Sequence, residues 1–159
     1  MGQYYKVCNK TKKEYLNPHT FGNGLKLMEF TSDGSGVLQG LSLLLANGNG
    51  RGGGDFRHED EDNLIGSWSG DSITIEGDYA DNTLWDVMSP TRYGENGDEP
   101  NPDYVEGWTD ISEKVFLLLM KDEYVRQREE ENIKEWGMPT YSETRMKVLT
   151  KVFGNENGN

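Results

Sequence analysis

Residues 48–62 read GNGRGGGDFRHEDED, and this stretch divides the chain between an apolar run and a strand-forming segment. Five of its first seven residues are glycine, and its last part is densely acidic. Glycine has no Cβ and reaches backbone conformations that other residues avoid, so such a loop can approach a ligand closely. A solvated linker is the alternative interpretation. We call residues 48–62 the glycine-acid loop.

The segment before the loop predicts a helix. Residues 37–46 read VLQGLSLLLA and are apolar nearly all round. They follow the helix-starting residues 32–35 and precede Asn47 and Gly48, a good C-terminal cap. We therefore expect a buried helix that ends at the loop.

The segment after the loop predicts a β-hairpin. In residues 64–79, Ile73 and Ile75 alternate with polar residues, which is the period of a half-buried strand. Residues 69–71 read SGD and would form the turn that connects this strand to a first strand at residues 65–68.

The N-terminal part predicts a second hairpin. Residues 3–9 and 14–16 are rich in β-favouring side chains, and the basic residues 10–13 would form its tip. A short apolar segment at residues 25–30 follows and predicts a helix.

The C-terminal part predicts helices. Asp110 would cap the clearest helix of the chain, with Glu113 completing a capping-box-like pair. We expect this helix to continue through a charged, solvated extension at residues 121–137. Residues 145–153 predict either a strand or a helix, and residues 154–159 predict a polar tail.

One long connection lies between the predicted hairpin and these helices. Residues 81–103 are rich in proline and glycine and predict a loop, with a short strand at residues 84–87. The fold class that we predict is α+β, with a small antiparallel sheet built from hairpins and helices packed on one face. The expected divisions are a compact domain at residues 1–120, the charged helix at 121–137 and a C-terminal segment at 138–159.

The charge and the cysteine content limit the possible functions. The chain of 159 residues carries 28 acidic and 16 basic side chains, a net charge of −12, which disfavours direct nucleic-acid binding. Cys8 is the only cysteine, so no disulfide forms within the chain and no multi-cysteine metal site is expected. We see no signal peptide and no apolar run of membrane-spanning length, and we expect a cytoplasmic protein in a bacterial or phage-infected cell.

The glycines at 48, 50 and 53 match the spacing G-x-G-x-x-G, but a dinucleotide site needs a strand before the motif and a helix after it. Here the predicted helix comes first and acidic residues follow, so we reject that interpretation.

Two small-ligand hypotheses remain for the glycine-acid loop. No cofactor is predicted, but a divalent cation is possible, because carboxylates are the ligands that Ca²⁺ and Mg²⁺ prefer. If a cation binds, its ligands would be Asp55, Glu59, Asp60 and Asp62, although Leu64 breaks the spacing of an EF-hand. A solvated acidic loop is the favoured interpretation.

The second hypothesis is a nucleotide or carboxylate site, with or without catalysis. Its ligand-binding residues would be Arg51, Gly52, Gly53, Asp55 and Lys26. If the protein is an enzyme, the catalytic residues would be His58, His19 and Asp55, because unperturbed histidine titrates near neutral pH. Structural or solvent-exposed roles are favoured for these residues.

Two acidic runs form the candidate surface for a protein partner. Their members are Glu59, Asp60, Glu61 and Asp62 in the glycine-acid loop and Glu129, Glu130 and Glu131 in the charged helix. Such runs usually face solvent and keep a protein soluble. In the alternative interpretation, the second run mimics a row of phosphates and binds a basic groove of a partner protein.

Several short motifs together resemble a family of small uncharacterised proteins from bacteria and their phages. They are MGQYYKV at the N-terminus, KEYLNPH from Lys13, GLKL from Gly24, RGGGD from Arg51, WSGDSI from Trp68, GDY from Gly77 and WTDI from Trp108. The resemblance ends near Leu119. The family has no established activity, so the resemblance implies no catalytic residue, but it implies an accessory role.

The sequence therefore favours a non-enzymatic acidic binding protein that engages or inhibits a protein partner, such as a nucleic-acid-processing or defence enzyme. The alternative is a small-ligand protein or enzyme that uses the glycine-acid loop. A structural oligomer is the further alternative.

Overall fold

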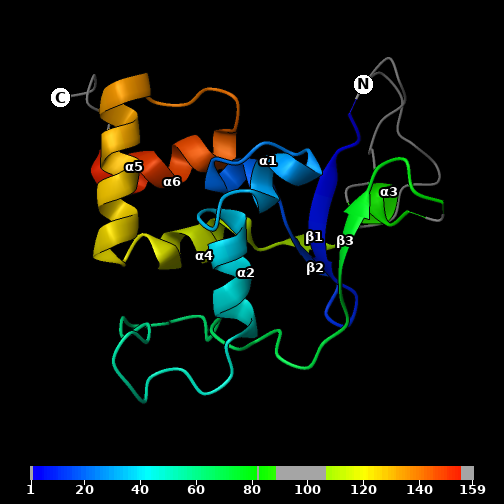
Figure 1. The fold of residues 1–159 in the computed structure, drawn as a ribbon, viewed down its shortest axis with the longest axis horizontal. Coiled ribbons are helices and arrows are strands. Elements are labelled where there is room, and N and C mark those ends of the chain that lie inside the picture. The colour runs from blue at the N-terminus through cyan, green and yellow to red at the C-terminus, as the bar shows by residue number, and fades with distance from the viewer. Residues whose placement is uncertain (1, 82, 89–106, 155–159) are drawn as a thin grey trace.

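The computed structural model describes residues 2–81, 83–88 and 107–154 (Figure 1). Most of the predicted loop at 81–103 and all but the first residue of the predicted tail lie outside these residues. The strands are β1 (Tyr5–Asn9), β2 (Glu14–Leu16), β3 (Ile73–Gly77) and β4 (Thr109–Asp110). The helices are the 3₁₀ helix η1 (Pro18–Phe21) and the α-helices α1 (Leu27–Thr31), α2 (Val37–Leu45), α3 (Trp85–Met88), α4 (Ser112–Leu119), α5 (Glu123–Trp136) and α6 (Glu143–Phe153).

The fold is α+β, as predicted, and its sheet is mixed rather than purely antiparallel. The strand order is β3-β1-β2-β4, in which β1 pairs antiparallel with β2 and β3 and β2 pairs parallel with β4. The parallel pair arises because β4 reaches the sheet from a distant part of the chain and not through a hairpin.

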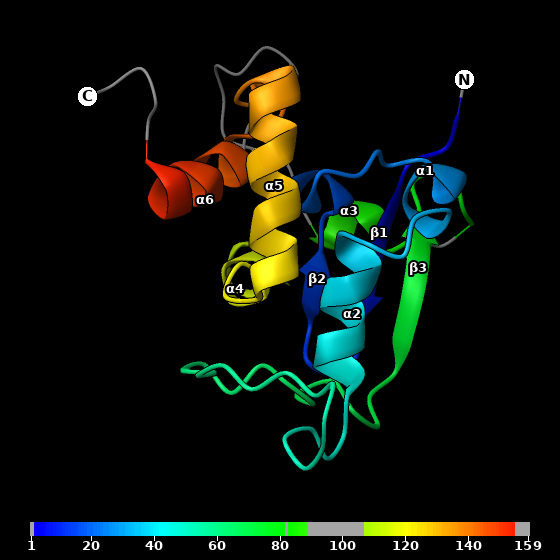
Figure 2. The same cartoon turned by 60° about the vertical axis from the view of Figure 1, so that its left-hand side comes forward.

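The N-terminal hairpin is confirmed. Its successive side chains alternate between two buried faces of the sheet. Val7 pairs with Leu16, and both belong to the main core; Cys8 pairs with Tyr15, and both belong to a smaller cluster with Met88. Successive side chains of a strand point to opposite faces. Among the described residues, the helices other than α3 lie on the Val7 face, and α3 covers the other face (Figures 1 and 2).

The predicted hairpin after the glycine-acid loop is wrong. Residues 65–70 form turns and no residue from 64 to 72 lies in a strand, and β3 pairs with β1 instead. Trp68 is fully buried, its indole N–H donates to Glu14 Oε1 at 2.9 Å, and its backbone N–H donates to the carbonyl of Leu44 at the end of α2. Burial of this large side chain holds the segment against α2, away from β3.

The predicted helix at 37–46 is α2, which buries one face rather than its whole circumference. Residues 145–153, for which a strand or a helix was predicted, lie in the helix α6. The predicted strand at 84–87 is wrong, because α3 occupies this position. The single C-terminal helix is also wrong. α4 ends at Leu119, and α5 begins anew where Asp122 Oδ1 accepts the N–H of Val125.

One core joins the elements of the Val7 face. Its buried side chains extend from Val7 in β1 through Val115 in α4 and Val125 in α5 to Leu149 in α6. The expected boundary at residue 120 falls between two helices that share this core. Among the described residues, no helix has the length and apolar character that a membrane span needs.

Candidate functional site

The glycine-acid loop closes on its own aspartate. Asp55 Oδ2 accepts backbone N–H groups from Gly50, Arg51 and Gly52 at 2.9, 2.7 and 2.8 Å. These hydrogen bonds lower the pKa of Asp55. Successive N–H groups in this arrangement make a cradle for an anion. Here the cradle is occupied by a carboxylate of the same loop.

The other residues predicted to bind a ligand in this loop do not converge. Arg51 and Gly53 are exposed, and a Cβ at Gly52 or Gly53 would meet nothing within 4 Å. The exposed ring of His58 packs edge-on against Phe56, with ring centroids 5.0 Å apart. Gly52 and Gly53 therefore serve the turns of the loop and line none of the hollows found among the described residues.

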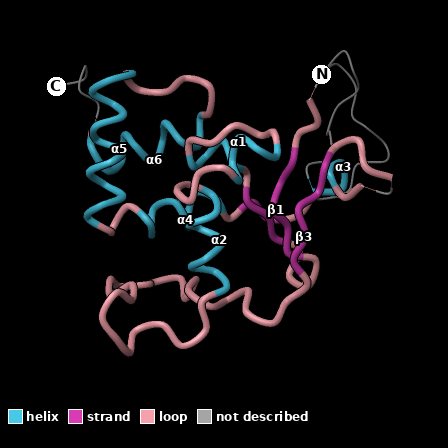
Figure 3. Tube along the Cα trace, viewed as in Figure 1, coloured by secondary structure: helices cyan, strands magenta, loops and turns pink. Residues whose placement is uncertain are grey.

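The structure does not bring His19 and Lys26 to this loop. Lys26 precedes α1, at the opposite end of α2 from the loop (Figure 3), and its backbone N–H donates to Glu29. The ring of His19 packs edge-on against Tyr141, before α6, and burial lowers its pKa. The expected grouping of these two side chains with Asp55 is wrong.

The carboxylates proposed as metal ligands do not form a metal site. Asp60 uses its two oxygens to accept the backbone N–H groups of Leu64 and Ile65, at 2.9 and 2.8 Å. Within the part of the chain that the structure describes, no three His, Cys, Asp or Glu side chains gather as a metal ion would require.

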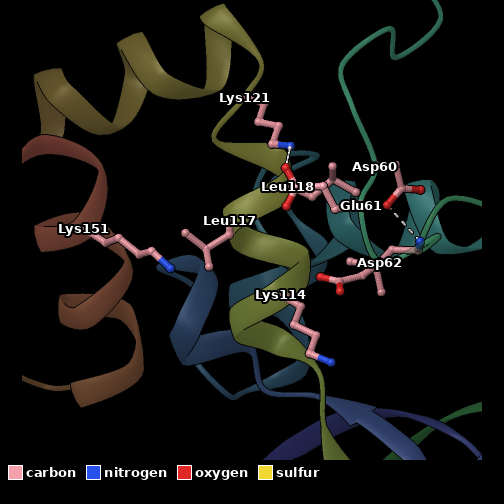
Figure 4. Close-up of a pocket in the computed structure, with 9 residues that line it drawn as sticks. Asp60, Glu61, Asp62, Lys114, Leu117, Leu118, Lys121 and Lys151 are labelled. Carbon is pink, nitrogen blue, oxygen red and sulfur yellow. Dashed lines mark hydrogen bonds and ion pairs between the residues drawn. The ribbon is translucent and has the colours of Figure 1, made fainter.

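The acidic end of the loop instead forms one wall of a hollow of about 300 Å³ (Figure 4). We call it the charged hollow. Its acidic lining residues are Asp60, Glu61 and Asp62, from the end of the glycine-acid loop. Its apolar lining residues are Leu64, Leu117 and Leu118, and its basic lining residues are Lys114 in α4, Lys121 just after α4 and Lys151 in α6. Three acidic and three basic side chains thus line one hollow.

Only part of this charge is paired. Lys121 Nζ lies 3.5 Å from Glu61 Oε1 (Figure 4). It also donates to the carbonyl of Glu59 at 2.6 Å. Among the described residues, Lys114 and Lys151 form no ion pair, and Asp62, which lines the same hollow, is exposed. Within the described residues, the charged hollow therefore contains charged groups of both signs that form no ion pair.

The second acidic run does not form a continuous surface. Glu129 is 2 % exposed, and its Oε2 accepts from Arg145 Nη2 at 2.5 Å, so its assignment to a partner surface is wrong. Glu130 and Glu131 are exposed on α5, and Glu130 lies 3.8 Å from Lys134 Nζ.

Sequence reasoning missed the three lysines of the charged hollow. Lys114 and Lys121 are one heptad apart and flank the apolar stripe of α4, which is a usable signal. Lys151 comes from α6, thirty residues further on, and only the packing of α6 on α4 places it there.

Comparison with known proteins finds no match to a family model, a curated protein or a solved structure. The resemblance to small bacterial and phage proteins stays a prediction.

Proposed function

We propose that this protein is a non-enzymatic binding protein that engages a protein partner at the charged hollow. The observation that carries the proposal is a frame of charges of both signs around an apolar floor, in which Glu61 is paired with Lys121 while Asp62, Lys114 and Lys151 form no ion pair among the described residues. Glu61 and Asp62 lie on one side, Lys114 and Lys151 on the other, and Leu117 between them. An apolar centre with a polar rim is the usual anatomy of a protein interface.

The charges support selectivity for a protein. A rim that carries both signs fixes the register of a partner and disfavours surfaces with the wrong pattern. The net charge of −12 adds a long-range attraction for a basic surface, such as that of a nucleic-acid-processing enzyme. An accessory or inhibitory role in a bacterium or an infecting phage is consistent with such a partner.

The glycine-acid loop supports the small-ligand alternative less well. A phosphate would have to displace the carboxylate of Asp55 from the three N–H groups that it accepts. Thermal unfolding with nucleotides and divalent cations tests this alternative, and a stabilisation that Asp55→Ala abolishes would favour it.

The proposal is tested by site-specific photo-crosslinking in a bacterial lysate. A photoreactive phenylalanine analogue replaces Lys114 at the hollow or, as the control, Tyr124, which is 83 % exposed on α5. We expect one discrete crosslinked protein from position 114 and none from position 124. The same product at both positions, or none at position 114, would contradict a site at the hollow.

Charge-reversal variants then distinguish binding at the charged hollow from attraction by the net charge alone. Glu61→Lys with Asp62→Lys is expected to weaken binding of the crosslinked protein by roughly tenfold or more. Glu130→Lys with Glu131→Lys changes the net charge equally but leaves the hollow intact. Equal losses in the two variants would show that binding follows net charge alone.

A further inference from the structure

A second pocket, of about 470 Å³, lies between the end of α5 and the beginning of α6. Asn132 and Trp136 line it from α5, Tyr141 from the connection, and Arg145 from α6. Its volume is within the range of small-molecule sites. No residue of the charged hollow belongs to it.

The decisive group in this pocket is the guanidinium of Arg145. Its side chain is 7 % exposed, and Nη2 donates to Glu129 Oε2 at 2.5 Å. Nε and Nη1 have no hydrogen-bond partner among the residues that the structure describes. Guanidinium nitrogens only donate, so these buried groups require an oxygen acceptor.

The guanidinium is held in place from several directions. Its central carbon lies 5.3 Å from the centroid of the Phe116 ring. Gly22 has φ +88°, and a Cβ at that position would lie 2.9 Å from the same guanidinium carbon. Glycine therefore lets the backbone after η1 approach Arg145 closely. A donor held in this way loses little freedom when it binds an acceptor.

The local charge favours an anionic acceptor. Glu129 carries one negative charge, while Arg145 lies at one of its oxygens and Arg128 Nη2 lies 3.6 Å from the other. The side chains of Glu129, Arg145 and Arg128 together carry a net charge of +1. A carboxylate is therefore preferred over a neutral carbonyl of the same shape.

The walls favour an aromatic body for this anion. Trp136 follows Val125, Glu129 and Ile133 at helical spacing, so it lies on the inward face of α5. Its side chain is nevertheless 80 % exposed, and Tyr141 is 56 % exposed on the same pocket. Both rings offer flat surfaces for stacking.

We propose that this pocket binds a small aromatic carboxylate. The carboxylate accepts from the guanidinium of Arg145, and the aromatic ring packs against Trp136 and Tyr141. This site is separate from the charged hollow, so neither proposal depends on the other.

The experiment titrates the whole protein with phenylacetate and follows backbone amide and indole signals by NMR. We expect saturable shifts in the Trp136 indole and in residues 137–145. Phenylacetamide, a neutral analogue of the same shape, is expected to bind roughly tenfold more weakly, as charge-assisted hydrogen bonds are the stronger kind. Equal binding of the two compounds would overturn the anion site, and so would saturation by inorganic phosphate without phenylacetate binding.

Matched variants locate the binding. Trp136→Ala is expected to weaken phenylacetate binding by roughly tenfold, whereas Tyr124→Ala, equally exposed on α5 but outside the pocket, should leave it unchanged. Substitution of Arg145 alone would leave the buried carboxylate of Glu129 without its ionic partner. Arg145→Met is therefore combined with Glu129→Leu so that the protein still folds. Unchanged affinity in this folded double variant, or no saturable binding to the unsubstituted protein, would overturn the proposal.

Discussion

The two acidic runs, residues 59–62 and 129–131, have similar composition and different surroundings. In the first run, the side chain of Glu61 is 69 % exposed and lies beside Lys121 at the surface. In the second run, Glu129 is 2 % exposed and paired with Arg145 in the core. Charge density along the sequence therefore did not determine which carboxylates face solvent.

The position of each acid relative to the apolar residues explains the difference. Glu129 lies four residues after Val125 and four before Ile133, so the helical period places all three on the inward face of α5. Residues 59–62 follow no such period, because they lie in a loop. There a carboxylate either accepts backbone N–H groups, as Asp60 does, or faces solvent.

The largest expected effect comes from removing the buried carboxylate. Glu129→Ala leaves the guanidinium of Arg145 buried without its ionic partner, which should lower the free energy of unfolding by about 3–5 kcal/mol. Glu130→Ala, the adjacent exposed residue, should change it by no more than about 0.5 kcal/mol. Urea unfolding of the two variants measures the difference.

A double variant controls for lost packing. Glu129→Leu with Arg145→Met replaces the pair by apolar side chains and should recover most of the lost stability. Equal unfolding free energies for Glu129→Ala and Glu130→Ala would show that the two positions share one environment.

Local sequence patterns predicted the elements whose partners are close in the chain. The hairpin of β1 and β2 and the helix α2 follow from β propensity, helical spacing and turn residues within short segments. The pairing of β3 with β1 joins residues more than sixty positions apart. The pattern around Ile73 identified a strand but not its partner, and the burial of Trp68 determined which partner was available.

The candidate site was predicted in part. The exposed acids Glu61 and Asp62 were identified, whereas Lys114 and Lys151 come together only because α4 and α6 pack side by side. Glu129 was the avoidable error, since its spacing from Val125 and Ile133 is visible in the sequence. Its partner Arg145 lies beyond α5 and carries no sequence signal of that contact.

The next largest effect concerns Asp60, the carboxylate of the first acidic run that accepts two backbone N–H groups. Asp60→Ala removes both acceptors for the N–H groups of Leu64 and Ile65, and we expect a loss of about 1–3 kcal/mol in unfolding free energy. Asp62→Ala, two residues away and exposed, should stay within about 0.5 kcal/mol. Thermal or urea unfolding of both variants tests whether one acid of this run is structural.

The smallest effect is local and concerns Asp55. Its pKa is lowered by the hydrogen bonds from Gly52, Arg51 and Gly50, so the carboxylate favours the closed loop at neutral pH. A lowered pKa in the folded state means that this contribution is complete above the ordinary aspartate pKa of about 4 and disappears as the pH falls through the lower, folded value. Global stability should change little, because the loop contributes few residues to the core.

NMR titration of the backbone amides measures this effect directly. We expect the N–H signals of Gly50, Arg51 and Gly52 to move together, with one midpoint below pH ~4. Asp55→Asn should displace these signals at neutral pH and remove their titration, while the signals of Leu64 and Ile65, which report on Asp60, stay in place. A common midpoint at or above pH ~4 would contradict the closed loop, because an aspartate without these hydrogen bonds titrates there.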